Sequence, residues 1–118
     1  MNGPEMKLRM RVTCGDAIAL GPGKIALLEA LDAAGSITAA ARALGMSYRR
    51  AWLLVEELNT HMREPAVQTV QGGARGGGSR LTPAGREVLR LYRTIERRAR
   101  RYCQADVEKL LAHFDATP

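Results

Sequence analysis

One short stretch of the sequence gathers groups that bind phosphates and bases: residues 47–52 read Ser-Tyr-Arg-Arg-Ala-Trp. Arginine donates paired hydrogen bonds to phosphate oxygens and to the edge of guanine. Ser47 can cap a helix starting at Tyr48, because its side chain accepts a hydrogen bond from a backbone N–H at the helix start, and it is also a candidate for binding phosphate. Arg49 and Arg50 then lie on the first turn, from which a helix contacts base edges in the DNA major groove. We expect at least one of them to bind DNA; the alternative is a solvated surface pair.

A second candidate segment is the glycine-rich run at residues 72–79, Gly-Gly-Ala-Arg-Gly-Gly-Gly-Ser. Glycine lets a backbone approach closely, so Arg75 within the run and Arg80 directly after it are candidates for minor-groove or phosphate contacts. Alternatively, the segment is simply mobile. It lacks the Lys-Ser/Thr ending and the strand-to-helix context of a nucleotide-binding loop.

Several other residues complete the candidate DNA surface. Ser36 and Thr38 open a short helix whose N-terminus can face a phosphate, although Ser36 has an equally good role as a simple cap. Tyr48 can contact a phosphate or a thymine methyl group, or be partly buried. For Trp52 we favour packing over a phosphate contact through its indole N–H. Arg42 is a weaker phosphate candidate.

The sequence lacks the residue patterns typical of metal binding and of catalysis. Apart from methionine, the soft metal ligands are Cys14, His61, Cys103 and His113, and none is spaced as in known zinc or copper sites. No Ser-His-Asp set or carboxylate pair stands out. We therefore expect no catalysis, no cofactor and no metal.

The composition describes the chain that must position these residues. Its 118 residues suit one domain, and the net charge is +6 because 18 basic residues, 15 arginines and 3 lysines, outnumber 12 acidic ones. The arginine excess favours nucleic acid as a partner. Two cysteines, no secretory signal and no apolar run long enough for a bilayer predict a cytoplasmic protein without membrane contact.

Hydrophobic spacing and capping residues predict the elements. Alternation over 7–13, with Leu8, Met10 and Val12 on one side, predicts a half-buried strand. The remaining segments carry helix caps or turn signals. We expect helices from Gly-Pro-Gly at 21–23 to about 34, over 37–44, over 48–62 and over 83–114. Between the last two helices we expect strands over 66–71 and 80–82, joined by an irregular segment at 72–79.

The central helices satisfy the steric rules of a helix-turn-helix. Ala41 is small where the next helix crosses, Gly45 follows four positions later in the turn, and Met46 comes next. Ala51 and Leu54 provide the inner face of the next helix. We therefore predict a mainly α fold with a small β wing (α+β), a winged helix-turn-helix forming a single domain over 1–118, with the helix-turn-helix at about 36–62, the wing at about 66–82 and the final helix at about 83–114.

These motifs also resemble a known family. Residues 36–52 and 71–92 are similar to the N-terminal DNA-binding domain of the molybdate-responsive regulator ModE, and Leu-Thr-Pro-Ala-Gly at 81–85 also resembles LysR-type regulators. The resemblance covers roughly residues 7–110 and implies binding of double-stranded DNA and dimerisation. Family members carry a C-terminal molybdate-binding module; this chain stops at Pro118, so we expect a short form with no molybdate site.

The final helix would be roughly 45 Å long at ~1.5 Å per residue, more than the protein needs to cover its core. We expect it either to bend near 104–106 or to pack on a second subunit. Its stripe predicts a homodimer interface formed by Leu89, Tyr92, Ile95, Ala99 and Tyr102. The alternative is that the stripe closes the protein's own core.

Together these features predict a sequence-specific transcriptional regulator that binds a pseudo-palindromic DNA site as a homodimer. The competing hypothesis is a winged-helix adaptor that binds protein, with its basic final helix docked on an acidic partner. Arg49, Arg50 and the arginine-bearing wing favour DNA, because protein docking does not require them.

Overall fold

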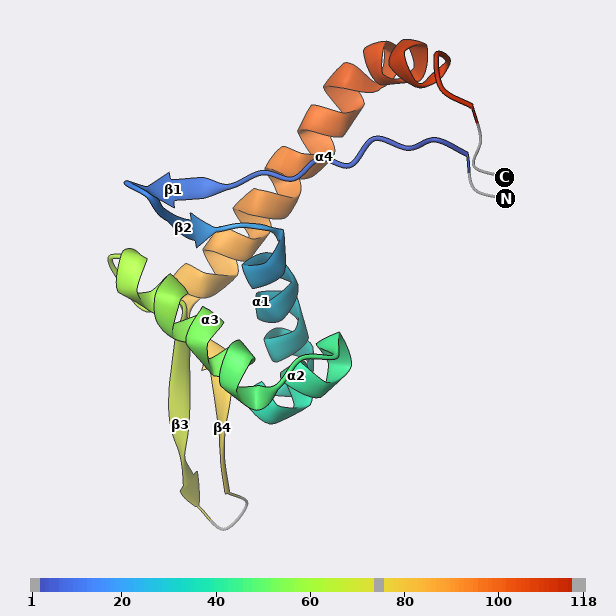
Figure 1. Cartoon of the computed structure of the whole chain (residues 1–118). Helices are drawn as coiled ribbons and strands as arrows, with labels where there is room; N and C mark the ends of the chain where they lie inside the picture. Colours follow the sequence, from blue (N-terminus) through green and yellow to red (C-terminus); the bar gives the residue numbers. More distant parts are fainter. Residues whose placement is uncertain (1–2, 74–75, 116–118) are drawn as a thin grey trace.

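The protein folds as a winged helix-turn-helix with a long C-terminal helix (Figure 1). The computed structural model describes residues 3–73 and 76–115, and the side chains of residues 71–77 are not described within it. The elements follow in the order β1 (Val12–Cys14), β2 (Ala17–Leu20), α1 (Pro22–Ala34), α2 (Ile37–Leu44), α3 (Tyr48–His61), β3 (Val67–Gly73), β4 (Gly76–Leu81) and α4 (Pro83–Leu111). The predicted fold class is confirmed.

Three helices begin where the sequence predicts, each at a hydroxyl cap. The Ser36 hydroxyl accepts a hydrogen bond from the Ala39 N–H at 3.1 Å, and Ser47 accepts one from the Arg50 N–H at the same distance. Thr82 accepts one from the Gly85 N–H at 3.0 Å. These bonds satisfy backbone donors that the first helical turn leaves without partners, and they fix the position of each turn.

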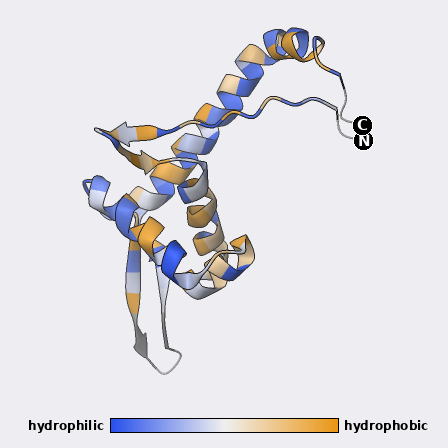
Figure 2. Cartoon of the chain, viewed as in Figure 1, coloured by the Kyte–Doolittle hydropathy of each residue, from blue (hydrophilic) through white to orange (hydrophobic). Residues whose placement is uncertain are grey.

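The core surrounds α1, whose Ile25 and Leu31 are fully buried. Figure 2 shows α1 as mainly hydrophobic and α4 as mainly hydrophilic with apolar residues at intervals. Ala41 on α2 and Ala51 on α3 are 2% and 0% exposed, so small side chains lie where these helices pack. Gly45 between them has φ of +68°, a conformation that favours glycine.

The expected strand over residues 7–13 is wrong. Only Val12–Cys14 forms a strand, which pairs antiparallel with β2 through a turn at Gly15 that has φ of +59°. The segment before it runs alongside α4 (Figure 1), with Leu8 half-buried. The Tyr92 hydroxyl donates a hydrogen bond to the Met10 carbonyl at 2.9 Å. Apolar and polar residues do alternate here, but the apolar side packs against helix α4 and not within a sheet.

The wing is more regular than expected. Residues 72–79 were predicted to be irregular, yet β3 continues to Gly73 and β4 begins at Gly76. Strand β4 lies against the end of α1, where the Ser79 N–H donates to the Gly35 carbonyl at 3.0 Å. A Cβ atom at Gly78 would lie 2.5 Å from that same carbonyl oxygen. Glycine therefore permits a strand here because the strand packs too closely for a side chain.

Helix α4 begins tightly packed and ends exposed. A Cβ atom at Gly85 would collide with the backbone carbonyl of Ala66, so glycine lets the first turn of α4 approach the start of β3. Further along, α4 extends away from the other helices and its last turns change direction (Figure 1). The radius of gyration is 17.2 Å, compared with about 13.5 Å for a compact domain of this length.

Candidate nucleic-acid interface

The first turn of α3 presents Tyr48, Arg49 and Arg50 to solvent. The Ser47 cap fixes the start of this turn, and Ala51, which directly follows it, is buried in the core. Within the described part of the chain, neither arginine forms an ion pair with a carboxylate. Both guanidinium groups are therefore available to an anionic partner.

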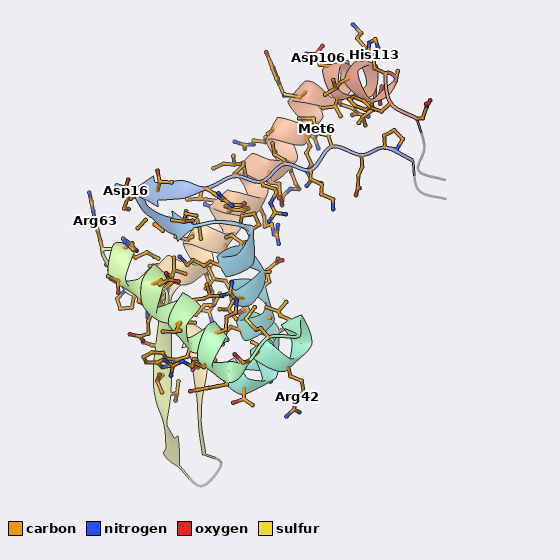
Figure 3. All side chains as sticks on the ribbon, viewed as in Figure 1. Met6, Asp16, Arg42, Arg63, Asp106 and His113 are labelled. Atoms are coloured by element: carbon orange, nitrogen blue, oxygen red, sulfur yellow. The ribbon has the colours of Figure 1, made fainter. Side chains whose placement is uncertain are left out.

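The start of α2 carries the other predicted phosphate-binding residues. Ser36 is half-buried and its hydroxyl caps the helix, whereas Thr38 is exposed. Arg42 points away from the body of the protein (Figure 3). The unpaired backbone N–H groups of a helix start favour an anion nearby, so α2 can support a phosphate contact beside the α3 turn.

The side of α3 that faces the wing carries two aromatic rings. Trp52 lies two helical turns before Asn59, and Asn59 bonds to β3, so Trp52 is on the side of the helix toward the wing. Tyr48 lies one turn before Trp52 on the same side. Tyr48 is 54% exposed and Trp52 is 43% exposed. Both rings are therefore accessible at the protein surface.

Asn59 was not identified from the sequence as a site residue, yet it fixes the wing to α3. Its amide oxygen accepts hydrogen bonds from the Ala66 and Val67 N–H groups at 2.8 and 3.2 Å, and its amide nitrogen donates to the Val67 carbonyl at 3.1 Å. The signal available in the sequence was a polar residue late in a predicted helix, seven residues before a predicted strand. The bonds make Asn59 a positioning residue for the interface.

The wing supplies one described arginine. Arg80 is exposed on β4 and pairs in register with Gln68 on β3, so both side chains lie on the same face of the hairpin. Ser79 and Leu81 on the other face are buried. The second predicted wing residue, Arg75, lies outside the described residues.

The arginines of α4 differ from those of α3 because most of them have carboxylate partners. Arg93 bonds to Glu29 on α1 and to Glu96, Arg90 bonds to Glu87, and longer ion pairs join Arg86 to Asp32 and Arg100 to Glu96. The hydrogen bond that Arg93 donates to the Glu29 carboxylate raises the pKa of the Arg93 guanidinium above its usual value. The pairs with Glu29 and Asp32 join α4 to α1, and the other three lie within α4 itself.

The predicted dimer residues fall into two groups. Tyr92 is 6% exposed and belongs to the protein's own core. The prediction that it contributes to an interface between subunits is therefore wrong. Leu89 is half-buried and packs on the same core. Ile95 and Tyr102 are 54% and 90% exposed, and Ala99 is half-buried.

Residues 3–73 and 76–115 contain neither a metal-ligand cluster nor a membrane-spanning helix. No group of three or more His, Cys, Asp or Glu side chains could hold a metal ion, and Cys14 and Cys103 are both exposed and unbonded. In the same residues no helix combines the length and the apolar character needed to cross a membrane.

Comparison with known proteins assigns the family. Residues 23–86, from the start of α1 to the first turn of α4, match the family described as "Bacterial regulatory helix-turn-helix protein, lysR family". The chain belongs to the LysR family of regulatory helix-turn-helix proteins. This membership makes it a DNA-binding regulatory protein and does not point to an enzyme.

This LysR-family chain is also similar to molybdenum-related proteins, which confirms the resemblance to ModE. It is 42% identical over 96 residues to "Molybdenum-pterin-binding protein MopB" of Rhodobacter capsulatus, a match covering 81% of this chain and 33% of MopB. It is 38% identical over 96 residues to "Molybdenum transport protein ModE" of Azotobacter vinelandii, covering 81% and 36%. It is 37% identical over 71 residues to "DNA-binding transcriptional dual regulator ModE" of Escherichia coli, covering 60% and 27%. The chain spans about a third of the length of these relatives.

Proposed function

We propose that this protein is a sequence-specific transcriptional regulator that inserts α3 into the major groove of double-stranded DNA. The observation that carries the proposal is the position of Arg49 and Arg50, which lie exposed on the capped first turn of α3 with no carboxylate partner in the described chain. An α-helix fits the major groove, and arginine there donates two hydrogen bonds to guanine. These two residues therefore read bases.

The surrounding residues position the protein on the DNA backbone. Thr38 and the capped ends at Ser36 and Ser47 bind phosphates on one side of α3, because helix starts favour anions. On the other side, Tyr48 and Trp52 contact the backbone strand that lies between α3 and the wing. Arg80, with Arg75 at the wing, contacts phosphate or the minor groove.

The regulator acts as a homodimer through α4. Two copies related by a two-fold axis place their α3 helices about 34 Å apart, one turn of DNA, and bind a pseudo-palindromic site. The exposed length of α4 supports this, since its outer half extends beyond the core and carries large apolar side chains in solvent.

The test begins with selection of bound sequences from random double-stranded DNA by the intact protein. The enriched sequences should contain two inverted half-sites one helical turn apart. Fluorescence anisotropy on the selected site should then show that Arg49→Ala and Arg50→Ala each weaken binding about 10- to 100-fold and relax the base preference. Arg63→Ala is the matched control, since Arg63 is an exposed arginine past the far end of α3 (Figure 3).

The protein-docking hypothesis predicts another result. An adaptor would enrich no DNA sequence, and any residual binding to DNA would not depend on Arg49 or Arg50. Equal loss in Arg49→Ala and Arg63→Ala would likewise contradict base reading by α3, because it would reduce the effect to net charge.

A further inference from the structure

Leu53 is an apolar residue at the centre of the solvent-facing side of α3. It lies two residues from both Ala51 and Val55, which are 0% and 5% exposed. Two residues correspond to about 200° around a helix, so Leu53 points almost directly away from the buried side. Leu53 itself is 43% exposed. The core of the protein therefore does not require a leucine at this position.

The neighbours of Leu53 belong to the proposed DNA surface. Arg49 and Arg50 precede it by four and three residues, so they lie beside it one turn closer to the start of the helix. Both arginines are exposed and have no carboxylate partner in the described chain. A partner that binds the two guanidinium groups therefore meets an apolar side chain one turn further along α3.

The charge on this side of α3 changes sign after Leu53. Glu56 follows three residues later and is also exposed. It forms no ion pair within the part of the chain that the structure describes. A free carboxylate repels phosphate groups, so close contact with DNA ends near this point. Base contacts by α3 are therefore confined to its first two turns, and Leu53 lies in the second.

One group on the base edges is suited to a leucine side chain. In the major groove thymine presents an apolar methyl group, whereas the other bases present only hydrogen-bond donors and acceptors. Leucine cannot pair with those polar groups, and covering them without a partner costs free energy. Contact with the methyl group instead removes apolar surface from water on both molecules.

We propose that Leu53 is a specificity-determining residue that contacts the methyl group of a thymine in the major groove. The inference rests on the proposed function and adds one base to the sequence that α3 recognises. Leu53 is about 6 Å from Arg49 along the helix axis, which corresponds to about two base-pair steps of DNA. Each half-site therefore contains a thymine within about two base pairs of the guanine bound by Arg49 or Arg50.

Deoxyuridine tests this contact, because it differs from thymidine only by the missing methyl group. Each thymidine in one half-site of the selected DNA is replaced in turn, and the dissociation constant is measured by fluorescence anisotropy. One replacement near the contacted guanine should weaken binding by the wild-type protein about fourfold, the effect of one buried methyl group. Leu53→Ala should bind the two DNAs equally. Leu91→Ala on α4 is the matched control, since Leu91 is also 43% exposed, and it should keep the wild-type preference.

Three results would overturn the role of Leu53. They are a selected half-site with no thymine near the guanine, a wild-type protein indifferent to deoxyuridine at every position, and a Leu53→Ala protein that keeps the preference for thymidine. None of them affects the arginine contacts of the proposed function.

A modified guanine tests those arginine contacts separately. 7-Deazaguanine lacks the N7 acceptor to which arginine donates. Wild type and Leu53→Ala should both lose affinity on DNA that carries it, and Arg49→Ala/Arg50→Ala should not. Indifference of the wild-type protein to 7-deazaguanine, together with a thymidine preference that requires Leu53, would contradict guanine reading and support the leucine contact. A protein that selects no DNA sequence would overturn both.

Discussion

Two groups of arginines in this protein have different surroundings. Those on α4 mostly touch carboxylates, as Arg93 touches Glu29 and Glu96 and Arg90 touches Glu87. Arg49 and Arg50 on α3 are exposed and have no carboxylate partner in the described chain. The larger concentration of positive charge therefore forms mainly ion pairs within the protein, and we propose that the smaller group binds DNA. If this proposal holds, net charge alone points to the wrong helix, because most of it lies on α4.

The largest expected effect is on the unfolding free energy. It concerns the close contact between α4 and the start of β3, which fixes the positions of the two arginine groups relative to each other. Gly85→Ala should lower the free energy of unfolding by about 2 to 3 kcal/mol, because the added Cβ collides with the Ala66 carbonyl and separates α4 from β3. Urea unfolding measures the loss. Gly23→Ala on α1 is the control, since its Cβ would meet nothing within 4 Å and should not destabilise the fold. Equal stability of the two variants would show that the close approach is not required.

The second prediction concerns the two arginines proposed to face DNA. Arg49→Ala and Arg50→Ala should each cost about 1 to 3 kcal/mol of specific binding and leave the unfolding free energy unchanged, because both side chains are exposed. Anisotropy and urea unfolding on the same preparations separate the two quantities. A variant that lost stability together with binding would place that arginine in the structural group.

The structural group should behave in the opposite way. Arg93→Ala removes the partner of Glu29 and Glu96 and should cost about 1 kcal/mol of stability, limited by the partial exposure of the pair. Arg93→Met keeps much of the stem and reports the loss of charge alone. The folded Arg93→Ala protein should bind the selected DNA as tightly as wild type. Weaker binding at full folding would break the distinction between the two groups.

The smallest expected effect concerns Arg90. Its hydrogen bond lowers the pKa of Glu87 below the usual 4.5, so in Arg90→Ala that pKa should rise toward the usual value. The stabilisation by this pair is present above the unfolded-state pKa of Glu87 and is lost as pH falls through its folded-state pKa. Because the pair is exposed, Arg90→Ala should change the unfolding free energy at pH 7 only slightly. Carbon NMR titration of the Glu87 carboxyl measures the shift. An unchanged Glu87 pKa would mean that the pair does not form in solution.

The sequence predicted the parts of the fold that depend on neighbouring residues. The caps at Ser36, Ser47 and Thr82 were correct because a cap and its N–H donor lie three residues apart. The family resemblance and the helix-turn-helix were also recovered, since the small residues and the turn glycine occupy a short stretch.

The errors come from contacts between distant segments. Residues 7–11 alternate like a strand but lie against α4, and nothing local distinguishes the two partners. Glycines 76–78 suggest irregular structure, yet Gly78 lies in a strand because the Gly35 carbonyl leaves no space for a side chain. Asn59 was missed for the same reason, since its three hydrogen bonds depend on where β3 begins.

The salt dependence of DNA binding tests the central distinction most directly. The logarithm of the association constant on the selected site should fall linearly with the logarithm of salt concentration, with a slope of about −0.9 for each neutralised phosphate. Arg49→Ala/Arg50→Ala should reduce the magnitude of this slope by up to about 2, less where an arginine bonds only to bases. Arg90→Ala/Arg93→Ala should leave the slope at the wild-type value. Equal reductions in the two double variants would contradict the account, because DNA would then respond to total charge.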